Sequence, residues 1–371
     1  MQIICPSCNA EYIIPDKKLP AAKALAKCKR CDGSITIDPT KIVSYDKAAA
    51  TPEGSLPAAS TPKTAEQRTS TPIEAADLRK IIDVYPELQA VAKDKFDLPS
   101  ILTPTKRGGY KTGKNKYKIR ILKAVQAKVE QILDHGEIVM RIGKGTAYYP
   151  LELFLGNGWL TMLYNHYAIL CTNRRILFVN INYRMSRSTH YLFQLPYTDI
   201  KKVKRGMLFN HLILYRHYGK RRIFNAVKGY INKELRAFIE KMQTASNATA
   251  PESGSNEKLC PSCFVPLPDK LKNCPKCSAG FKGPQTALVR SFILPGLGDM
   301  YLGHRALGAL EMLGSIVVWL LVVSSLLAGG VENYVVAAMI LVFYNGLDGL
   351  LTFHMAQKGY MLAAPKTAAA R

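Results

Sequence analysis

Cys260-Pro261-Ser262-Cys263 is followed, after ten intervening residues, by Cys274-Pro275-Lys276-Cys277. Two Cys-x-x-Cys knuckles at this separation can place four thiolates tetrahedrally around one Zn²⁺, with each sulfur about 2.3 Å from the metal. A closed shell of four sulfurs leaves no position for a substrate water, so such a site is structural rather than catalytic. The sequence therefore predicts a small zinc ribbon over residues 258–282.

The same arrangement occurs near the N-terminus. Cys5 and Cys8 form one knuckle, and Cys28 and Cys31 form another after 19 intervening residues. This pattern predicts a zinc ribbon over residues 1–44, which ends in the strand-like alternation Ser34-Ile35-Thr36-Ile37. Redox-active cysteine pairs are the alternative, but no βαβ pattern surrounds any pair. We therefore expect Zn²⁺ as the cofactor, bound at two structural sites.

Positive charge is concentrated in the middle of the chain. The formal net charge is +24, and the segment from Lys106 to Lys241 holds 27 Lys and Arg against 7 Asp and Glu. Such a segment repels itself unless acidic groups lie nearby, and the phosphates of lipid headgroups or nucleic acid are common candidates. A well-hydrated surface without a ligand is the alternative. The predicted anion or lipid contacts are Arg174, Arg175, Lys201, Lys202, Lys204, Arg205, Lys220, Arg221 and Arg222.

Residues 45–100 are expected to be a flexible linker with short helices. The part from Lys47 to Pro72 contains almost no large apolar residue, so it cannot bury enough surface to offset its chain entropy. Residues 73–95 show a partly helical pattern that Pro86 interrupts. This pattern predicts one or two short helices.

Residues 101–247 are expected to form a basic β-domain with a preceding helix. Apolar residues recur at helical spacing over 119–133 and again over 228–242. Between these helices the period changes to that of strands. Many strands followed by one helix favour a small barrel or sandwich plugged by that helix. The predicted strands are 138–142, 151–155, 167–172, 175–180, 191–195, 200–205, 208–215 and 221–224.

Two apolar runs near the C-terminus, Ala309–Ala328 and Tyr334–Phe353, are each long enough to cross about 30 Å of hydrocarbon. The short connection between them has no Lys or Arg, whereas cations flank both outer ends, so we expect both termini in the cytoplasm. The start of the chain also lacks the features of a secretory signal. Residues 283–371 are therefore predicted to be a two-helix transmembrane hairpin with a short tail, in a bacterial cytoplasmic (inner) membrane. A pair of buried core helices is the alternative.

Two shorter features belong to the hairpin. Residues 291–300 are too short to span and are expected to be interfacial or re-entrant. Asn345 and Asp348 lie at membrane depth, where an unpaired carboxylate costs at least ~2.5 kcal/mol. Asp348 therefore needs a partner, a proton or the helix end, and a structural role is favoured over a proton or ion relay.

Catalytic motifs are incomplete. Gly108–Lys114 has the spacing of a phosphate-binding loop, but Asn115 replaces the Ser or Thr that would hold Mg²⁺. The histidines show no H-E-x-x-H spacing, and the chain has no G-x-S-x-G elbow. We therefore expect no enzymatic activity.

Three regions resemble known families. Met1–Cys8, together with Cys28–Cys31, resembles the finger-like zinc ribbons at the N-termini of many bacterial proteins, although Asp32 intervenes before the usual glycine. Residues 137–242 resemble a bacterial pleckstrin-homology-like domain, most clearly at Tyr167–Phe178 and Leu195–Ile200. That resemblance implies a seven-stranded barrel capped by a C-terminal helix and a role in lipid or protein binding.

Residues 284–355 are similar to the two-transmembrane hairpin family, through Pro295–Arg305 and the acid Asp348 in the second helix. Members of that family commonly carry an Asp there, which favours its structural role. The resulting fold class is multidomain: two small zinc ribbons, an all-β pleckstrin-homology-like barrel with a C-terminal helix, and an α-helical two-span hairpin.

This organisation predicts a membrane-anchored adaptor or sensor without enzymatic activity. Its zinc ribbons and basic domain would bind an unknown protein partner or anionic lipid headgroups. The alternative is a membrane-tethered nucleic-acid-binding regulator, because zinc ribbons and basic segments with interleaved aromatic residues also suit phosphate backbones.

Overall fold

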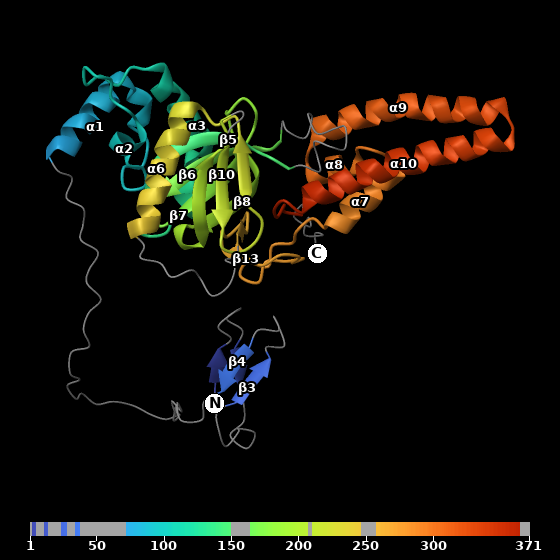
Figure 1. Ribbon diagram of the computed structural model, residues 1–371, viewed down its shortest axis with the longest axis horizontal. Coiled ribbons are helices and arrows are strands. Elements are labelled where there is room, and N and C mark those ends of the chain that lie inside the picture. The colour runs from blue at the N-terminus through green and yellow to red at the C-terminus, as the bar shows by residue number, and fades with distance from the viewer. Residues whose placement is uncertain are drawn as a thin grey trace, which may run out of the picture. The chain divides into compact units, whose positions relative to one another are not determined.

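The computed structural model describes residues 2–4, 11–13, 24–27, 34–37, 72–149, 164–206, 210–245 and 257–363 (Figure 1). The chain divides into two units, Met1–Glu66 and Gln67–Arg371. The predicted linker over residues 47–71 and the predicted strand over residues 151–155 lie outside the described residues.

Two antiparallel hairpins are described in the first unit. Strand β1 (Gln2–Ile4) pairs with β2 (Glu11–Ile13), and β3 (Ala24–Lys27) pairs with β4 (Ser34–Ile37). The strand predicted at Ser34–Ile37 is therefore present. In the sequence, each hairpin encloses one Cys-x-x-Cys pair, as a ribbon with two knuckles requires. The four cysteines themselves lie outside the described residues.

A curled antiparallel sheet forms the centre of the second unit. Its order is β13-β12-β8-β7-β6-β5-β11-β10-β9, and a 3-10 helix, η3 (Tyr197–Asp199), separates β8 from β9. The strands are β5 (Val139–Ala147), β6 (His166–Thr172), β7 (Arg175–Ile181), β8 (Ser188–Pro196), β9 (Ile200–Arg205), β10 (Leu212–Arg216), β11 (Arg222–Asn225), β12 (Lys258–Leu259) and β13 (Pro266–Leu267).

The sheet is an open half-barrel within the described residues, whereas the sequence predicted a small barrel or sandwich. Strands β5 to β11 provide seven strands, but consecutive strands β8 and β9 do not pair with each other. The free edge of β8 instead receives β12, through the pairing of Lys258 with Phe193. Strand β12, which leads into the second cysteine module, therefore occupies the edge of β8 that would have to pair with β9 to close a barrel.

Both faces of the sheet are covered, so β6 is buried along its whole length. Ala168, Leu170 and Val179 belong to a cluster on the first face. Tyr167, Ile169 and Phe178 alternate with them and belong to a cluster on the second face. Alternate side chains of a strand point to opposite faces, which explains the division.

Four helical segments cover the first face: α1 (Pro72–Val84), η2 (Pro86–Leu88), α2 (Leu98–Ile101) and α3 (Gly113–Ile132). Ile81, Leu88 and Phe96 are fully or almost fully buried there. Residues 81–100, expected to belong to a flexible linker with short helices, thus contain such helices and contribute apolar side chains to the core of this unit. Their apolar residues are irregularly spaced around Pro86, so their contribution depends on packing against α3 and the sheet.

Helix α6 (Gly229–Ala245) covers the second face. It lies so close to β5 that a Cβ added at Gly143 would be 2.5 Å from Cγ2 of Ile231. Glycine is therefore required by the close approach of the helix and the strand.

The C-terminal helices are α7 (Pro284–Ile293), α8 (Leu297–Leu302), α9 (Arg305–Ala328) and α10 (Val331–Ala356). Helices α9 and α10 are long and apolar enough to cross a membrane, and only 28% and 33% of their most apolar stretches are buried. Their base contacts the β-domain: the Tyr164 hydroxyl accepts from the Leu307 amide (3.1 Å), and the Tyr191 hydroxyl donates to the Met355 carbonyl (2.9 Å).

Candidate metal centre and basic groove

Cys260, Cys263, Cys274 and Cys277 converge on one point. Their four sulfur atoms all lie within 4.8 Å of one another. The Cys260 and Cys277 sulfurs are 3.7 Å apart, and those of Cys263 and Cys274 are 3.5 Å apart. Sulfurs placed tetrahedrally at 2.3 Å from Zn²⁺ would be separated by about 3.8 Å. The four side chains therefore fit a structural zinc ion.

Both knuckles of this cluster have the same backbone geometry. The residue after the second cysteine has a positive φ in each case, +59° at Phe264 and +56° at Ser278. The amide of Phe264 donates to the carbonyl of Cys260 (3.0 Å), and that of Ser278 donates to the carbonyl of Cys274 (2.9 Å). The turns bring the two sulfurs of each knuckle to the same side of the backbone.

The thiols of this cluster differ in how easily they ionise. A hydrogen bond from the Ala279 backbone lowers the pKa of the Cys277 thiol to about 6, whereas burial raises that of Cys260 to about 12. A buried thiol that resists ionisation needs a cation to hold it as a thiolate. Four thiolates around Zn²⁺ satisfy this requirement.

The second ribbon is joined to the sheet by hydrogen bonds and ion pairs. The amide of Gln194 in β8 donates to the carbonyl of Glu257 (2.7 Å). The Glu257 carboxylate pairs with Arg222 (2.5 Å) and with Arg216, which also pairs with Asp199 (2.6 Å). These contacts hold the ribbon against strands β8, β10 and β11.

Two of the predicted anion-contact residues are neutralised within the protein. Arg175 pairs with Glu137 (2.7 Å), and its side chain is only 14% exposed. Burial by itself would raise the pKa of Glu137, but hydrogen bonds from Arg175 and Thr172 lower it below its usual value. Arg222 is held by Glu257. The structure thus places Arg175 and Arg222 in ion pairs, where their charges stabilise the fold.

The other predicted contacts are exposed. Arg174 donates to the backbone carbonyl of His135 (3.0 Å), and Arg205 donates to the side chain of Asn210 (2.6 Å). Lys204 lies over the ring of Tyr215. The remaining exposed residues lie on β9 and on the turn between β10 and β11: Lys201, Lys202, Lys220 and Arg221.

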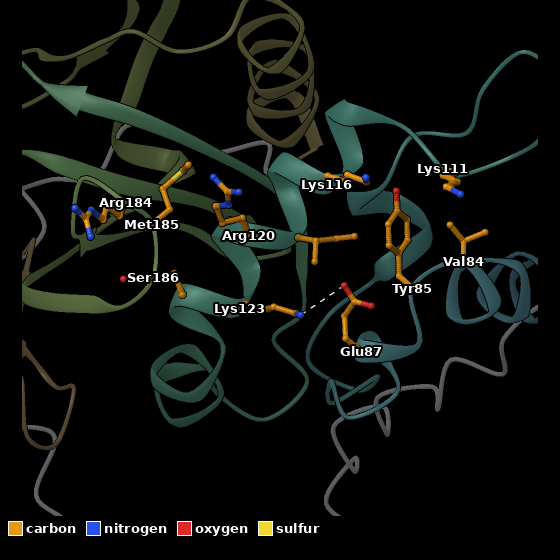
Figure 2. A pocket seen from close by; sticks show the side chains of 12 residues that line it. Val84, Tyr85, Glu87, Lys111, Lys116, Arg120, Lys123, Arg184, Met185 and Ser186 are labelled. Carbon is orange, nitrogen blue, oxygen red and sulfur yellow. Dashed lines mark ion pairs between the residues drawn. The ribbon is translucent and has the colours of Figure 1, made fainter.

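A second set of cations surrounds a groove of about 630 Å³ that the sequence analysis did not identify. Its lining comes from the end of α1, from η2, from α3 and the segment just before it, and from the turn between β7 and β8; Figure 2 shows these side chains. One ion pair crosses the groove, between Lys123 and Glu87 (3.5 Å). The lining residues are Val84, Tyr85, Glu87, Lys111, Lys116, Ile119, Arg120, Lys123, Ala124, Arg184, Met185 and Ser186.

A partial signal for this basic groove exists in the sequence. Lys116, Arg120 and Lys123 recur at positions i, i+4 and i+7, which places them on one face of α3. Arg184 comes from the turn between β7 and β8. Glu87 comes from η2, within the segment that the sequence predicted to be a linker with short helices. These parts come together only where η2 and the turn between β7 and β8 lie beside α3.

Asn345 and Asp348 are both buried in α10. The Asp348 carboxylate accepts a hydrogen bond from the amide of Gly296 (3.1 Å), at the turn between α7 and α8. Asp348 thus has a partner, as its position in the apolar helix requires.

Comparison with known proteins supports the N-terminal ribbon. Residues 1–36 match the family model of a zinc-ribbon domain. No curated protein shows a significant match to the chain.

Proposed function

We propose that this protein is a membrane-anchored adaptor, without enzymatic activity, that holds an acidic protein partner at the cytoplasmic face of a bacterial inner membrane. Helices α9 and α10 form the anchor with both termini in the cytoplasm. Two zinc ribbons provide rigid surfaces, and the basic groove receives an acidic segment of the partner. Strands β5 to β11 followed by α6 support a pleckstrin-homology-like relationship of the β-domain.

The lining of the basic groove carries this proposal. Five exposed Lys and Arg face one acid, Glu87, so the groove has an excess of positive charge. Apolar atoms of Val84, Ile119 and Met185 lie among these cations. A segment with both acidic and apolar side chains would complement such a surface better than a purely polyanionic ligand.

The position of the groove supports a protein partner over the membrane lipid. The groove-forming elements η2 and α3 pack on the first face of the sheet, through residues such as Leu88 and Val125. The base of the apolar helices packs on the second face, through Leu307 and Met355. The groove thus lies across the sheet from the hairpin base, and a cytoplasmic partner can reach it.

The test uses full-length, zinc-loaded protein in nanodiscs of neutral lipid. Binding of a labelled peptide of alternating Glu and Leu, of anionic vesicles and of a mixed-sequence DNA duplex would be measured at physiological salt. Lys116→Gln/Arg120→Gln removes two charges from the groove. Lys201→Gln/Lys202→Gln removes two from β9 and is the matched control.

We expect the peptide to bind and the groove variant to weaken it by up to about 30-fold, because each exposed ion pair contributes up to about 1 kcal/mol. The β9 variant should change it less than about threefold, since those charges lie outside the groove. Tighter binding of DNA that depends on the groove would favour the nucleic-acid regulator. Groove-dependent binding of anionic vesicles in place of the peptide would favour a lipid ligand.

A further inference from the structure

Three buried carboxylates meet near the base of the apolar helices. Asp299 lies on α8, Glu311 on α9 and Asp348 on α10. Each is at most 7% exposed, and one oxygen from each lies within 4.8 Å of the others. Three acids from three helices thus occupy one small volume.

Positive charge does not balance these acids within the part of the chain that the structure describes. Their one ion-pair partner there is His304, whose Nδ1 lies 3.0 Å from Oδ1 of Asp299. No described Lys or Arg pairs with any of the three. Like charges at this separation repel strongly where water is excluded, so the cluster needs protons or a cation.

Hydrogen-bond donors near the cluster are already used. The Thr352 hydroxyl donates to Oδ2 of Asp299 (2.8 Å), and the Gly296 amide donates to Oδ2 of Asp348 (3.1 Å). Two buried acceptors remain without a partner, Oε2 of Glu311 and Oδ1 of Asn345. Asn345 lies one turn from Asp348 on the buried face of α10. Both of these unsatisfied atoms are oxygen acceptors, so the site lacks a hydrogen-bond donor or a cation.

We infer that Asp299, Glu311 and Asp348, with the side-chain oxygen of Asn345, bind a divalent metal cation. Carboxylate and amide oxygens are the ligands preferred by Mg²⁺, Mn²⁺ and Ca²⁺. Oxygens that ligate one Ca²⁺ at about 2.4 Å are at most about 4.8 Å apart, and the three carboxylate oxygens meet this limit. One such ion would offset two negative charges and link α8, α9 and α10.

This site is independent of the proposed groove and of its partner. The bound cation would fix the turn at Gly296 and the base of the helices, where the tilted rings of Tyr164 and His304 have centroids 4.8 Å apart. The role assigned to the ion is therefore to hold the anchor in one arrangement against the β-domain.

Mn²⁺ is the probe, because it binds oxygen sites built for either Mg²⁺ or Ca²⁺ and its free form is measured directly by electron paramagnetic resonance. Full-length protein with zinc-loaded ribbons, in neutral detergent, would be titrated with MnCl₂. Glu311→Gln preserves the shape of the side chain and removes its charge. Glu332→Gln, at the exposed start of α10, is the matched control.

We expect one Mn²⁺ per chain, at least tenfold weaker binding in Glu311→Gln, and unchanged binding in Glu332→Gln. Asn345→Leu, which keeps the volume and removes the oxygen, should weaken binding at least threefold. Equal elution volumes and tryptic patterns would show that the variants are folded. The absence of a stoichiometric site in the wild-type protein, or equal affinity in wild type and Glu311→Gln, would overturn the inference and show that protons neutralise the cluster.

Discussion

Replacing Cys274 by serine is expected to remove one Zn²⁺ and unfold the second ribbon while the β-domain stays folded. The cluster around the cysteines contains only two large buried apolar side chains, Leu267 of the ribbon and Tyr360 of the segment after α10. Their burial contributes a few kcal/mol at about 1.5–3 kcal/mol each. Ordering some twenty residues costs at least about 20 kcal/mol in backbone entropy. Zinc binding, at about 10 kcal/mol or more, is therefore decisive for this segment.

The β-domain should survive because its attachment to the ribbon is local. Loss of the ribbon removes one strand pairing, Lys258 with Phe193, and leaves Arg216 paired with Asp199. The second hydrophobic cluster of the sheet remains intact, and the first loses only Leu259 and its contact with Phe264. A decrease of a few degrees in the unfolding temperature is expected, which corresponds to about 1 kcal/mol.

Two measurements test this prediction. Zinc per chain, determined with a chromogenic chelator after denaturation, should fall by one ion. Trypsin should cleave at the exposed Lys270 and Lys272 at least about tenfold faster, because the ribbon's local opening free energy falls by more than 1.4 kcal/mol. Ser262→Ala, which leaves all four sulfurs and the backbone in place, is the control. A Cys274→Ser protein that keeps the zinc content of the wild type and resists trypsin would refute the reasoning, and so would loss of the whole β-domain.

Two further predictions concern the β-domain. Gly143→Ala should destabilise it by about 1–3 kcal/mol, because the new methyl group would overlap Ile231; an unchanged unfolding temperature would contradict this packing. Burial, with a smaller effect of Lys144, lowers the pKa of His166 to about 4. The unfolded state therefore binds a proton that the folded state does not, so stability should be full above pH 6.5 and fall by about 2–3 kcal/mol as the pH decreases to 4. His166→Gln should flatten this decrease in thermal unfolding measured from pH 7.5 to 4, whereas the exposed His217→Gln should retain it.

The cysteine spacings and the apolar runs show how much the sequence could predict. A Cys-x-x-Cys knuckle is a local turn, so its geometry depends on four or five consecutive residues and can be recognised from them. The length of α9 and α10 follows from runs of apolar residues in the same way. The strand periods of β6, β7 and β9 were also correctly predicted, because alternation is a property of a short segment.

Ion pairing, in contrast, depended on segments far apart in the chain. Arg175 and Arg222 were expected to contact an external anion, but Glu137 and Glu257 lie beside them after separations of 38 and 35 residues. The sequence shows which side chains are charged, but it does not show which oppositely charged residue, far away in the chain, the fold will bring next to each of them.

The same limit applies to the functional regions. Local sequence determined the knuckles, the apolar helices and the excess of positive charge. Tertiary packing decided that residues 81–100 belong to the core, that η2 and α3 enclose a basic groove, and that Asp299, Glu311 and Asp348 meet at one point. Each of these features needs contact between elements that the chain connects only through long intervening segments, and burial of apolar surface brings those elements together.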